Sequence, residues 1–473
     1  MFNYNRQPGW REFQSELRLT SRRKKRLPRL IKFFSLVLIT AGIIVAIDIV
    51  SLESLPEIVA TVKNHLPMEK TQPADLIDSP GEKSEKTTQQ TPMTKQDLRA
   101  LLNPSLIFNT ETSKIMIQGT TEKFFVETSL DPSLQRLLTR NLDELKTLTR
   151  GKPQRIGLVA MEPFSGKIVA MAGFDLGNPS ANPCTMDDYP AASIFKIVTA
   201  SAVVETIGYS PETPLYFNGG KYTLYKRQLK ETQNRYTTRV TLAKAFAESI
   251  NPIFGKIAAT RLDPETLTLY ARAFGFNQAM DSDFSFDSGK MLITDSTYQQ
   301  AEVGCGFNKT TTISPMFGAM LSSTIVNQGN RIVPSVVERV TDTKGTVVYA
   351  SAPPHTQRAV NSKTARAVRT MMSRTITQGT ARKAFRGAQR DSTLSKLEIG
   401  GKTGSINSRD NTIRYDWFTG FAKEKNGEKA LALAVVVGHR KYIGTRASTY
   451  GKMIFKHYFN AYFASNKTTA NRG

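Results

Sequence analysis

A serine and a lysine stand three residues apart in the apolar stretch "DDYPAASIFKIVTA" (187–200). If this stretch is helical, Ser193 and Lys196 share a face, so the hydroxyl can meet the amine. Apolar surroundings and a helix N-terminus both disfavour the ammonium and lower the lysine pKa. The pair therefore predicts a serine nucleophile whose base is a lysine. The spacing alone is not specific, because Ser21 and Lys24 also show it, and a surface lysine at a helix start is the alternative interpretation.

Other residue types that commonly take part in catalysis or metal binding do not form a recognisable motif. None of the histidines lies near a serine or cysteine in a catalytic motif, so a Ser-His-Asp triad is not predicted; they are His65, His355, His439 and His457. The sequence has no HExxH, no CxxC and no glycine-rich phosphate loop, so neither a metal nor a cofactor is expected. Cys184 and Cys305 fit no metal spacing. They could pair outside the cytoplasm, but two buried free thiols are the preferred interpretation.

Two further motifs follow in the chain. Ser249 and Asn251 occur in "AFAESINPIF" (245–254), 56 residues after Ser193, where helix capping would be the ordinary explanation. Lys402 begins the Lys-Thr-Gly of "EIGGKTGS" (398–405), 153 residues after Ser249, where a strand-edge turn would need no special function. Each motif is weak alone, and the order and spacing of all three carry the signal.

This set resembles the serine–lysine acyl-transferases that comprise penicillin-binding proteins and β-lactamases. Longer segments are similar to penicillin-binding transpeptidase domains as well: "VETSLDPSLQ" (126–135), "LVAMEPFSGKIVAMA" (158–172), residues 303–340 and "DWFTGFA" (416–422). The resemblance covers roughly residues 121–465. The sequence departs from the usual pattern at Ala191-Ala192, Cys305 and Ser405, and none of these departures removes a catalytic side chain.

The resemblance implies a role for each of the first two motifs. Ser193 would attack the penultimate carbonyl of a peptidoglycan stem peptide that ends in D-Ala-D-Ala. Lys196 would take the serine proton, and Ser249 would relay a proton to the leaving amine. Asn251 would orient the side chains and the substrate amide.

The third motif would bind the substrate. By the same resemblance, Lys402 would supply a positive field that keeps Lys196 neutral and attracts the terminal carboxylate, to which Thr403 would hydrogen-bond. Gly404 would let the substrate lie against the strand. The N–H group of Ser405, with that of Ser193, would form the oxyanion hole.

The implied activity is D,D-transpeptidation, in which an amine of a neighbouring stem peptide takes the acyl group. β-Lactams would inhibit it by mimicking the donor. One alternative uses water as acceptor, as in a D,D-carboxypeptidase or a serine β-lactamase. Another is a non-catalytic wall-binding or β-lactam-sensing protein, although the intact motifs argue against it. No glycosyltransferase domain is found in the sequence, so a separate glycosyltransferase is an expected partner.

The elements that must position these residues point to one α+β domain. Residues 130–148 predict a helix that Asp131-Pro132 begins. Residues 155–174 predict two strands around a turn, and residues 416–422 and 429–438 a second hairpin, before a closing helix at 449–463. Because helices and loops fill the middle, we expect an antiparallel sheet that joins both ends of the chain and packs between helices. The predicted domain spans 121–465 and leaves a tail at 466–473.

The N-terminal region predicts a membrane anchor. Residues 1–32 hold ten Lys or Arg and two Glu, and an uncharged apolar run follows from Phe33 to Ile47. Residues 33–50 nearly reach the length that spans a bilayer. A core helix or a cleaved signal peptide are the alternatives, and the basic block as a nucleic-acid site is the weaker interpretation, so no nucleic-acid partner is expected.

The basic flank should stay cytoplasmic, which gives a single-pass protein of the cytoplasmic (inner) membrane. The catalytic domain would then be periplasmic or otherwise extracytoplasmic. The polar residues of 51–120 predict a largely disordered linker between the anchor and this domain.

Overall fold

The computed structural model describes residues 93–120, 122–294 and 296–470, without the side chains of 467–470. Its centre is a five-stranded antiparallel sheet in the order β13-β14-β15-β3-β4. These strands are β3 (Arg155–Met161), β4 (Ile168–Asp175), β13 (Leu397–Asn407), β14 (Arg414–Glu424) and β15 (Ala430–His439). Since β3 pairs with β15, the two predicted hairpins join into one sheet. The predicted α+β class is confirmed.

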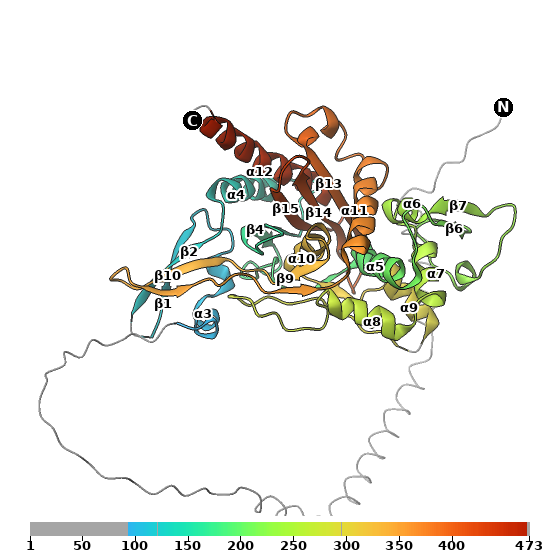
Figure 1. Cartoon of the computed structure of the whole chain (residues 1–473), viewed down its shortest axis with the longest axis horizontal. Coiled ribbons are helices and arrows are strands. Elements are labelled where there is room, and N and C mark those ends of the chain that lie inside the picture. Colours follow the sequence, from blue (N-terminus) through green and yellow to red (C-terminus); the bar gives the residue numbers. More distant parts are fainter. Residues whose placement is uncertain (1–92, 121, 295, 471–473) are drawn as a thin grey trace, which may run out of the picture. The chain divides into compact units, whose positions relative to one another are not determined.

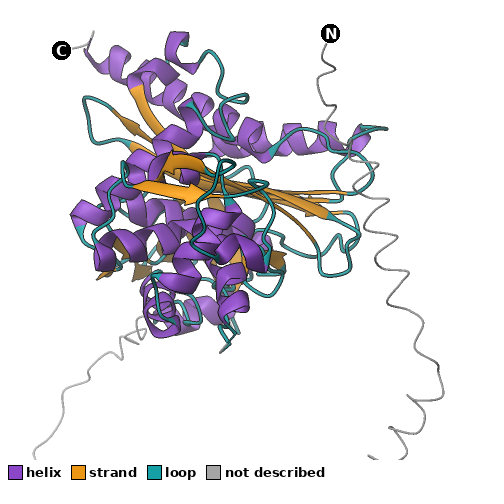
Figure 2. Ribbon diagram, turned by 90° about the vertical axis from the view of Figure 1, so that its right-hand side faces the viewer, coloured by secondary structure: helices purple, strands orange, loops and turns teal. Residues whose placement is uncertain are grey.

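Side chains along a strand alternate between the two faces of a sheet. In this sheet both faces are buried, because each packs against helices. On β15, Leu431, Leu433 and Val435 belong to a core that also contains side chains of α4 (Pro132–Thr147) and α12 (Ala447–Ala470). Ala432, Ala434 and Val436 belong to the other core, together with α10 (Pro315–Val326). Helices consequently cover the sheet on both sides (Figure 2).

Most of the other helices and short elements lie between the hairpins in sequence. The α-helices are α5 (Lys196–Ile207), α6 (Leu242–Ala247), α7 (Asn251–Thr260), α8 (Pro264–Ala273), α9 (Thr297–Cys305) and α11 (Ser362–Thr377). The 3₁₀ turns are η2 (Ala192–Phe195), η3 (Lys226–Leu229), η4 (Ala388–Arg390) and η5 (Leu394–Lys396). Short strands pair as β5 (Tyr189–Pro190) with β8 (Thr312–Ile313), β6 (Pro214–Phe217) with β7 (Thr238–Thr241), and β9 (Asn330–Ile332) with β12 (Thr356–Arg358).

A second sheet corrects the predicted start of the domain. Its strands are β1 (Lys114–Gln118), β2 (Lys123–Thr128), β10 (Val337–Thr341) and β11 (Val347–Ala350), in that order. Figure 1 labels the first three of them. Together with α3 (Lys95–Leu101) and η1 (Pro104–Leu106), β1 falls inside the predicted linker of 51–120. Residues 95–118 are therefore folded, because pairing with β2 and a capping box at Thr94 stabilise them. At the other end, α12 passes the predicted boundary at 465 and reaches Ala470.

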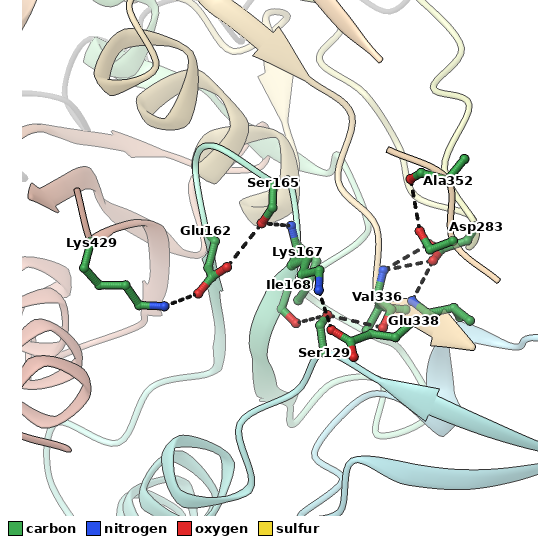
Figure 3. Close-up of polar contacts among 12 residues, drawn as sticks. Ser129, Glu162, Ser165, Lys167, Ile168, Asp283, Val336, Glu338, Ala352 and Lys429 are labelled. Atoms are coloured by element: carbon green, nitrogen blue, oxygen red, sulfur yellow. Dashed lines mark hydrogen bonds and ion pairs between the residues drawn. The ribbon is translucent and has the colours of Figure 1, made fainter. Parts of the chain in front are cut away.

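Hydrogen bonds join the second sheet to the β3–β4 hairpin (Figure 3). The Ser129 hydroxyl contacts the carbonyl oxygens of Ile168, at 2.8 Å, and Val336, at 3.2 Å. Lys167 forms an ion pair of 2.6 Å with Glu338. The end of β2 and the start of β10 are thus fastened to the hairpin that opens the central sheet.

The predicted membrane anchor at 33–50 lies outside the described residues. Contacts divide the chain into units 1–87 and 88–473, and every described residue belongs to the second. Within 93–120, 122–294 and 296–470, no helix has both the length and the apolar character needed to cross a membrane.

Candidate active site

Ser193 lies in η2, directly before α5, and Lys196 is the first residue of that helix. The lysine Nζ is 2.8 Å from the serine Oγ, so the structure brings the first predicted pair together. The backbone of the preceding Ala192 has φ +49°, a region that costs a non-glycine residue energy. Gly306 presses against it, since a Cβ there would lie 1.8 Å from the Ala192 carbonyl oxygen. Packing between these two backbones fixes the serine.

Lys196 is completely buried, and its three described hydrogen bonds all go to neutral groups. Its Nζ donates to Ser193 Oγ and to Asn251 Oδ1, each at 2.8 Å, and to the carbonyl oxygen of Cys305 at 2.5 Å. Burial penalises the ammonium and lowers the pKa of Lys196 to about 8. A sizeable fraction of this amine is therefore neutral near pH 7 to 8 and able to accept a proton.

The second motif lies between α6 and α7. Ser249 has φ +57°, and Asn251 opens α7. Helix capping does not explain them, because Ile250 is the N-cap of α7 and makes no side-chain cap bond. The Asn251 amide nitrogen donates to the Tyr222 carbonyl at 3.1 Å, which turns the amide oxygen toward Lys196. The segment around Tyr222 thus orients the lysine through the asparagine.

The third motif brings a second buried lysine to the site. Lys402 projects from β13 with no exposed surface, and its Nζ donates to Ser249 Oγ at 3.0 Å and to the Thr403 carbonyl at 2.9 Å. Burial, and secondarily the charge of Lys196, hold the pKa of Lys402 well below its usual value. The sequence suggested a constant positive charge at this position. In the structure, the charged form of Lys402 is instead disfavoured.

The β13 strand forms the edge of the central sheet and passes close to the serine. A Cβ at Gly404 would lie 3.1 Å from the Ala192 Cβ and 3.3 Å from the Ser193 nitrogen, so glycine permits this approach. Thr403 is half-buried and Ser405 is exposed, which leaves the strand accessible beside the nucleophile. Edge strands present unpaired backbone groups to which an extended peptide can bind.

Three contributors to the site were not identified from the sequence. Two are backbone carbonyls, those of Tyr222 and Cys305, and no side-chain pattern reveals a carbonyl. The third is Thr380, in the loop after α11, whose Oγ1 is 2.5 Å from Thr403 Oγ1. The only sequence signal for it is the preceding Gly379.

The two cysteines are free and buried. The Cys184 thiol donates to the carbonyls of Leu158 and Ala172, and burial raises its pKa to about 12. Burial raises the pKa of Cys305 to about 11. Both are therefore unreactive thiols at neutral pH. Among the residues that the structure describes, no three His, Cys, Asp or Glu side chains are arranged to hold a metal ion.

The chain is similar in sequence to penicillin-binding proteins. The family model described as penicillin binding protein transpeptidase domain matches residues 156–459. The peptidoglycan D,D-transpeptidase PbpA of Mycolicibacterium smegmatis is 23% identical over 350 residues, which are 66% of this chain and 67% of that protein. The penicillin-binding protein PbpB of the same species is 23% identical over 296 residues, 59% of this chain. The chain spans only 44% of the length of PbpB.

Solved structures show the same fold. The crystal structure of PBPA from Mycobacterium tuberculosis has a TM-score of 0.57 at 20% identity and covers 70% of this chain and 81% of its own. The D,D-transpeptidase domain of a peptidoglycan glycosyltransferase from Eggerthella lenta has a TM-score of 0.56 at 21% identity, with 71% and 83% covered. With the family model matching most of the folded part, the chain belongs to the penicillin-binding protein transpeptidase domain family.

Proposed function

We propose that this protein is a membrane-anchored D,D-transpeptidase that cross-links peptidoglycan stem peptides through an acyl-serine intermediate. One observation carries the proposal: a fully buried lysine amine lies 2.8 Å from the Ser193 hydroxyl. A serine–lysine pair of this kind can form an acyl-enzyme without a histidine. Family membership, and the similarity to PbpA, which is named a peptidoglycan D,D-transpeptidase, support this choice of reaction.

Acylation begins when neutral Lys196 takes the proton of Ser193 and the serine oxygen attacks the penultimate carbonyl of the donor. The N–H groups of Ser193 and Ser405 stabilise the tetrahedral oxyanion. When the intermediate collapses, the peptide bond breaks, and the departing amine of D-alanine gains a proton through Ser249. The Ser193 oxygen is then esterified to the donor peptide. Asn251 accepts a hydrogen bond from Lys196 and also orients the substrate amide.

The terminal carboxylate of the donor lies between Lys402 and the Thr403 hydroxyl. A nearby opposite charge favours the ammonium, so donor binding raises the pKa of Lys402 above its value in the free protein. Lys402 is thereby charged when the donor carboxylate is bound. In the free enzyme, a neutral Lys402 avoids a second buried positive charge near Lys196. Gly404 leaves room for the donor backbone along the edge of β13.

Deacylation transfers the acyl group to an amine of a neighbouring stem peptide. The test is product analysis with a pentapeptide donor and an excess of amine acceptor. We expect a cross-linked dimer that increases with acceptor concentration and is absent with Ser193→Ala. Free tetrapeptide as the only product, at every acceptor concentration, would identify a carboxypeptidase instead.

The proposed location follows from the basic block before residue 33. The N-terminus would be cytoplasmic, residues 33–50 would span the inner membrane, and the domain would face the periplasmic or cell-wall side, with a separate glycosyltransferase as partner. Protease added to intact cells should cleave beyond residue 51 and spare a tag at residue 1. Loss of that tag from intact cells would contradict this orientation.

A further inference from the structure

Thr380 occupies a short loop that reaches from the end of α11 to the edge of β13. Its Oγ1 lies 2.5 Å from Thr403 Oγ1, within the range of a hydroxyl–hydroxyl bond. Its backbone N–H donates to the carbonyl oxygen of Ala247 at 3.0 Å, two residues before Ser249. The loop is pressed closely onto that carbonyl, because a Cβ at Gly379 would lie 2.3 Å from the same oxygen. One residue thus links the second motif to the third.

Either oxygen could be the donor in the bond between Thr380 and Thr403, and the arrangement in which Thr380 donates leaves the Thr403 proton free for another acceptor. A threonine hydroxyl has one proton to donate. Its distance to the Ala247 carbonyl is 3.4 Å, beyond the usual range for O–H···O bonds, whereas Thr403 is at 2.5 Å. When Thr380 donates to Thr403, the Thr403 proton has to point elsewhere. The Thr403 proton can then point toward the exposed edge of β13, beside Gly404 and Ser193.

We propose that Thr380 is a positioning residue: it fixes the Thr403 hydroxyl as a donor and so sets the preference for substrates that end in a free carboxylate. This inference rests on the proposed function, in which Thr403 binds that carboxylate. A carboxylate accepts hydrogen bonds and cannot donate, so a hydroxyl held as a donor is matched to it. An uncharged ester gains less from the same hydroxyl.

Removing the Thr380 hydroxyl should leave the loop in place. The side chain is exposed, and the bond that anchors the loop comes from the backbone. Thr380→Val has nearly the same shape without the hydroxyl, and Thr380→Ser restores the hydroxyl without the methyl group. Thr370→Val is the matched control, because Thr370 is also exposed and donates only within α11, to the Arg366 carbonyl at 3.1 Å.

The experiment compares acylation of the full-length chain by one β-lactam with a free carboxylate and by its methyl ester. We expect the parent to prefer the carboxylate. Thr380→Val should lower that preference about tenfold, with the ester rate nearly unchanged, because one charge-assisted bond loses its fixed donor. Thr380→Ser should restore the preference, and Thr370→Val should keep it.

An unchanged preference in Thr380→Val would overturn the inference. So would an equal loss with both compounds, since a purely structural role has that effect, or a failure of Thr380→Ser to restore the ratio. Thermal unfolding reports whether each variant folds, and Thr380→Ala replaces the valine variant if it does not. A parent chain that neither compound acylates at Ser193 would instead contradict the proposed function, and this inference with it.

Discussion

Acylation of Ser193 should accelerate as the pH rises toward 8, because the proposed base is a buried lysine. Burial lowers the pKa of Lys196 to about 8, and a lysine loses its proton as the pH rises. The neutral fraction is then about 1% at pH 6 and about 50% at pH 8, by the ordinary titration of a single group. If neutral Lys196 takes the serine proton, the acylation rate constant should rise about fiftyfold over this interval and level off above it.

Stopped-flow measurements with a chromogenic β-lactam between pH 6 and pH 9.5 test this, with two variants. Lys196→Arg should lose at least about a hundredfold in rate and lose the rise with pH, because arginine stays protonated. Lys256→Arg is the matched control. Lys256 is also buried, but it donates to the Tyr216 carbonyl and pairs with Glu231, and no step of the mechanism uses it.

A rate that is constant between pH 6 and pH 8, or one that falls as the pH rises, would refute the assignment of Lys196 as base. Near-parental acylation by a correctly folded Lys196→Arg variant would do the same. A loss of rate in Lys256→Arg equal to that in Lys196→Arg would show that burying an arginine, rather than losing the base, slows the reaction.

Three further predictions concern other residues. Gly404→Ala places a methyl group 3.3 Å from the Ser193 nitrogen, so acylation should slow by about tenfold or more in the same assay, while the melting temperature changes little. Ser249→Ala removes one of two described acceptors of Lys402, so we expect slower acylation and a loss of about 1–3 kcal/mol in the free energy of unfolding, measured with urea. Burial lowers the pKa of His439 to about 4, so the unfolded chain binds its proton first as the pH falls below about 6.5. The parent should therefore lose about 2 kcal/mol more stability than His439→Asn between pH 7 and pH 5, and equal losses would show that His439 is not responsible.

The contact between Ser193 and Lys196 could be predicted because its signal is local. Ser193 and Lys196 are three residues apart at the junction of η2 and α5, so their contact follows from one turn of the chain. The two hairpins could be predicted for the same reason, since the apolar strands and the turn of each lie in one continuous segment. In each case the interaction that matters joins residues close in sequence.

The parts that could not be predicted depend on distant backbone and on burial. The carbonyls of Tyr222 and Cys305 orient Asn251 and Lys196, but a carbonyl belongs to every residue and leaves no mark in a sequence. The depressed pKa of Lys402 was missed because no nearby residue type reveals that its amine is completely buried.

The start of the folded domain was placed too late for a related reason. The polar residues of 51–120 predict a linker, yet Leu98 is buried and β1 completes a sheet with β2 and β10. Distant partners help to hold this region: Lys95 and Arg99 form ion pairs with Asp281, and β2, the partner of β1, pairs on its other side with β10. No local sequence pattern shows these partnerships.

Peptide mapping by mass spectrometry after incubation with benzylpenicillin tests the central claim most directly, because it identifies the atom that is acylated. The mechanism predicts one penicilloyl group per chain, on Ser193, absent from Ser193→Ala and strongly reduced in Lys196→Arg. A penicilloyl group on any other residue, or undiminished labelling of Ser193→Ala, would contradict the assignment of Ser193 as the nucleophile.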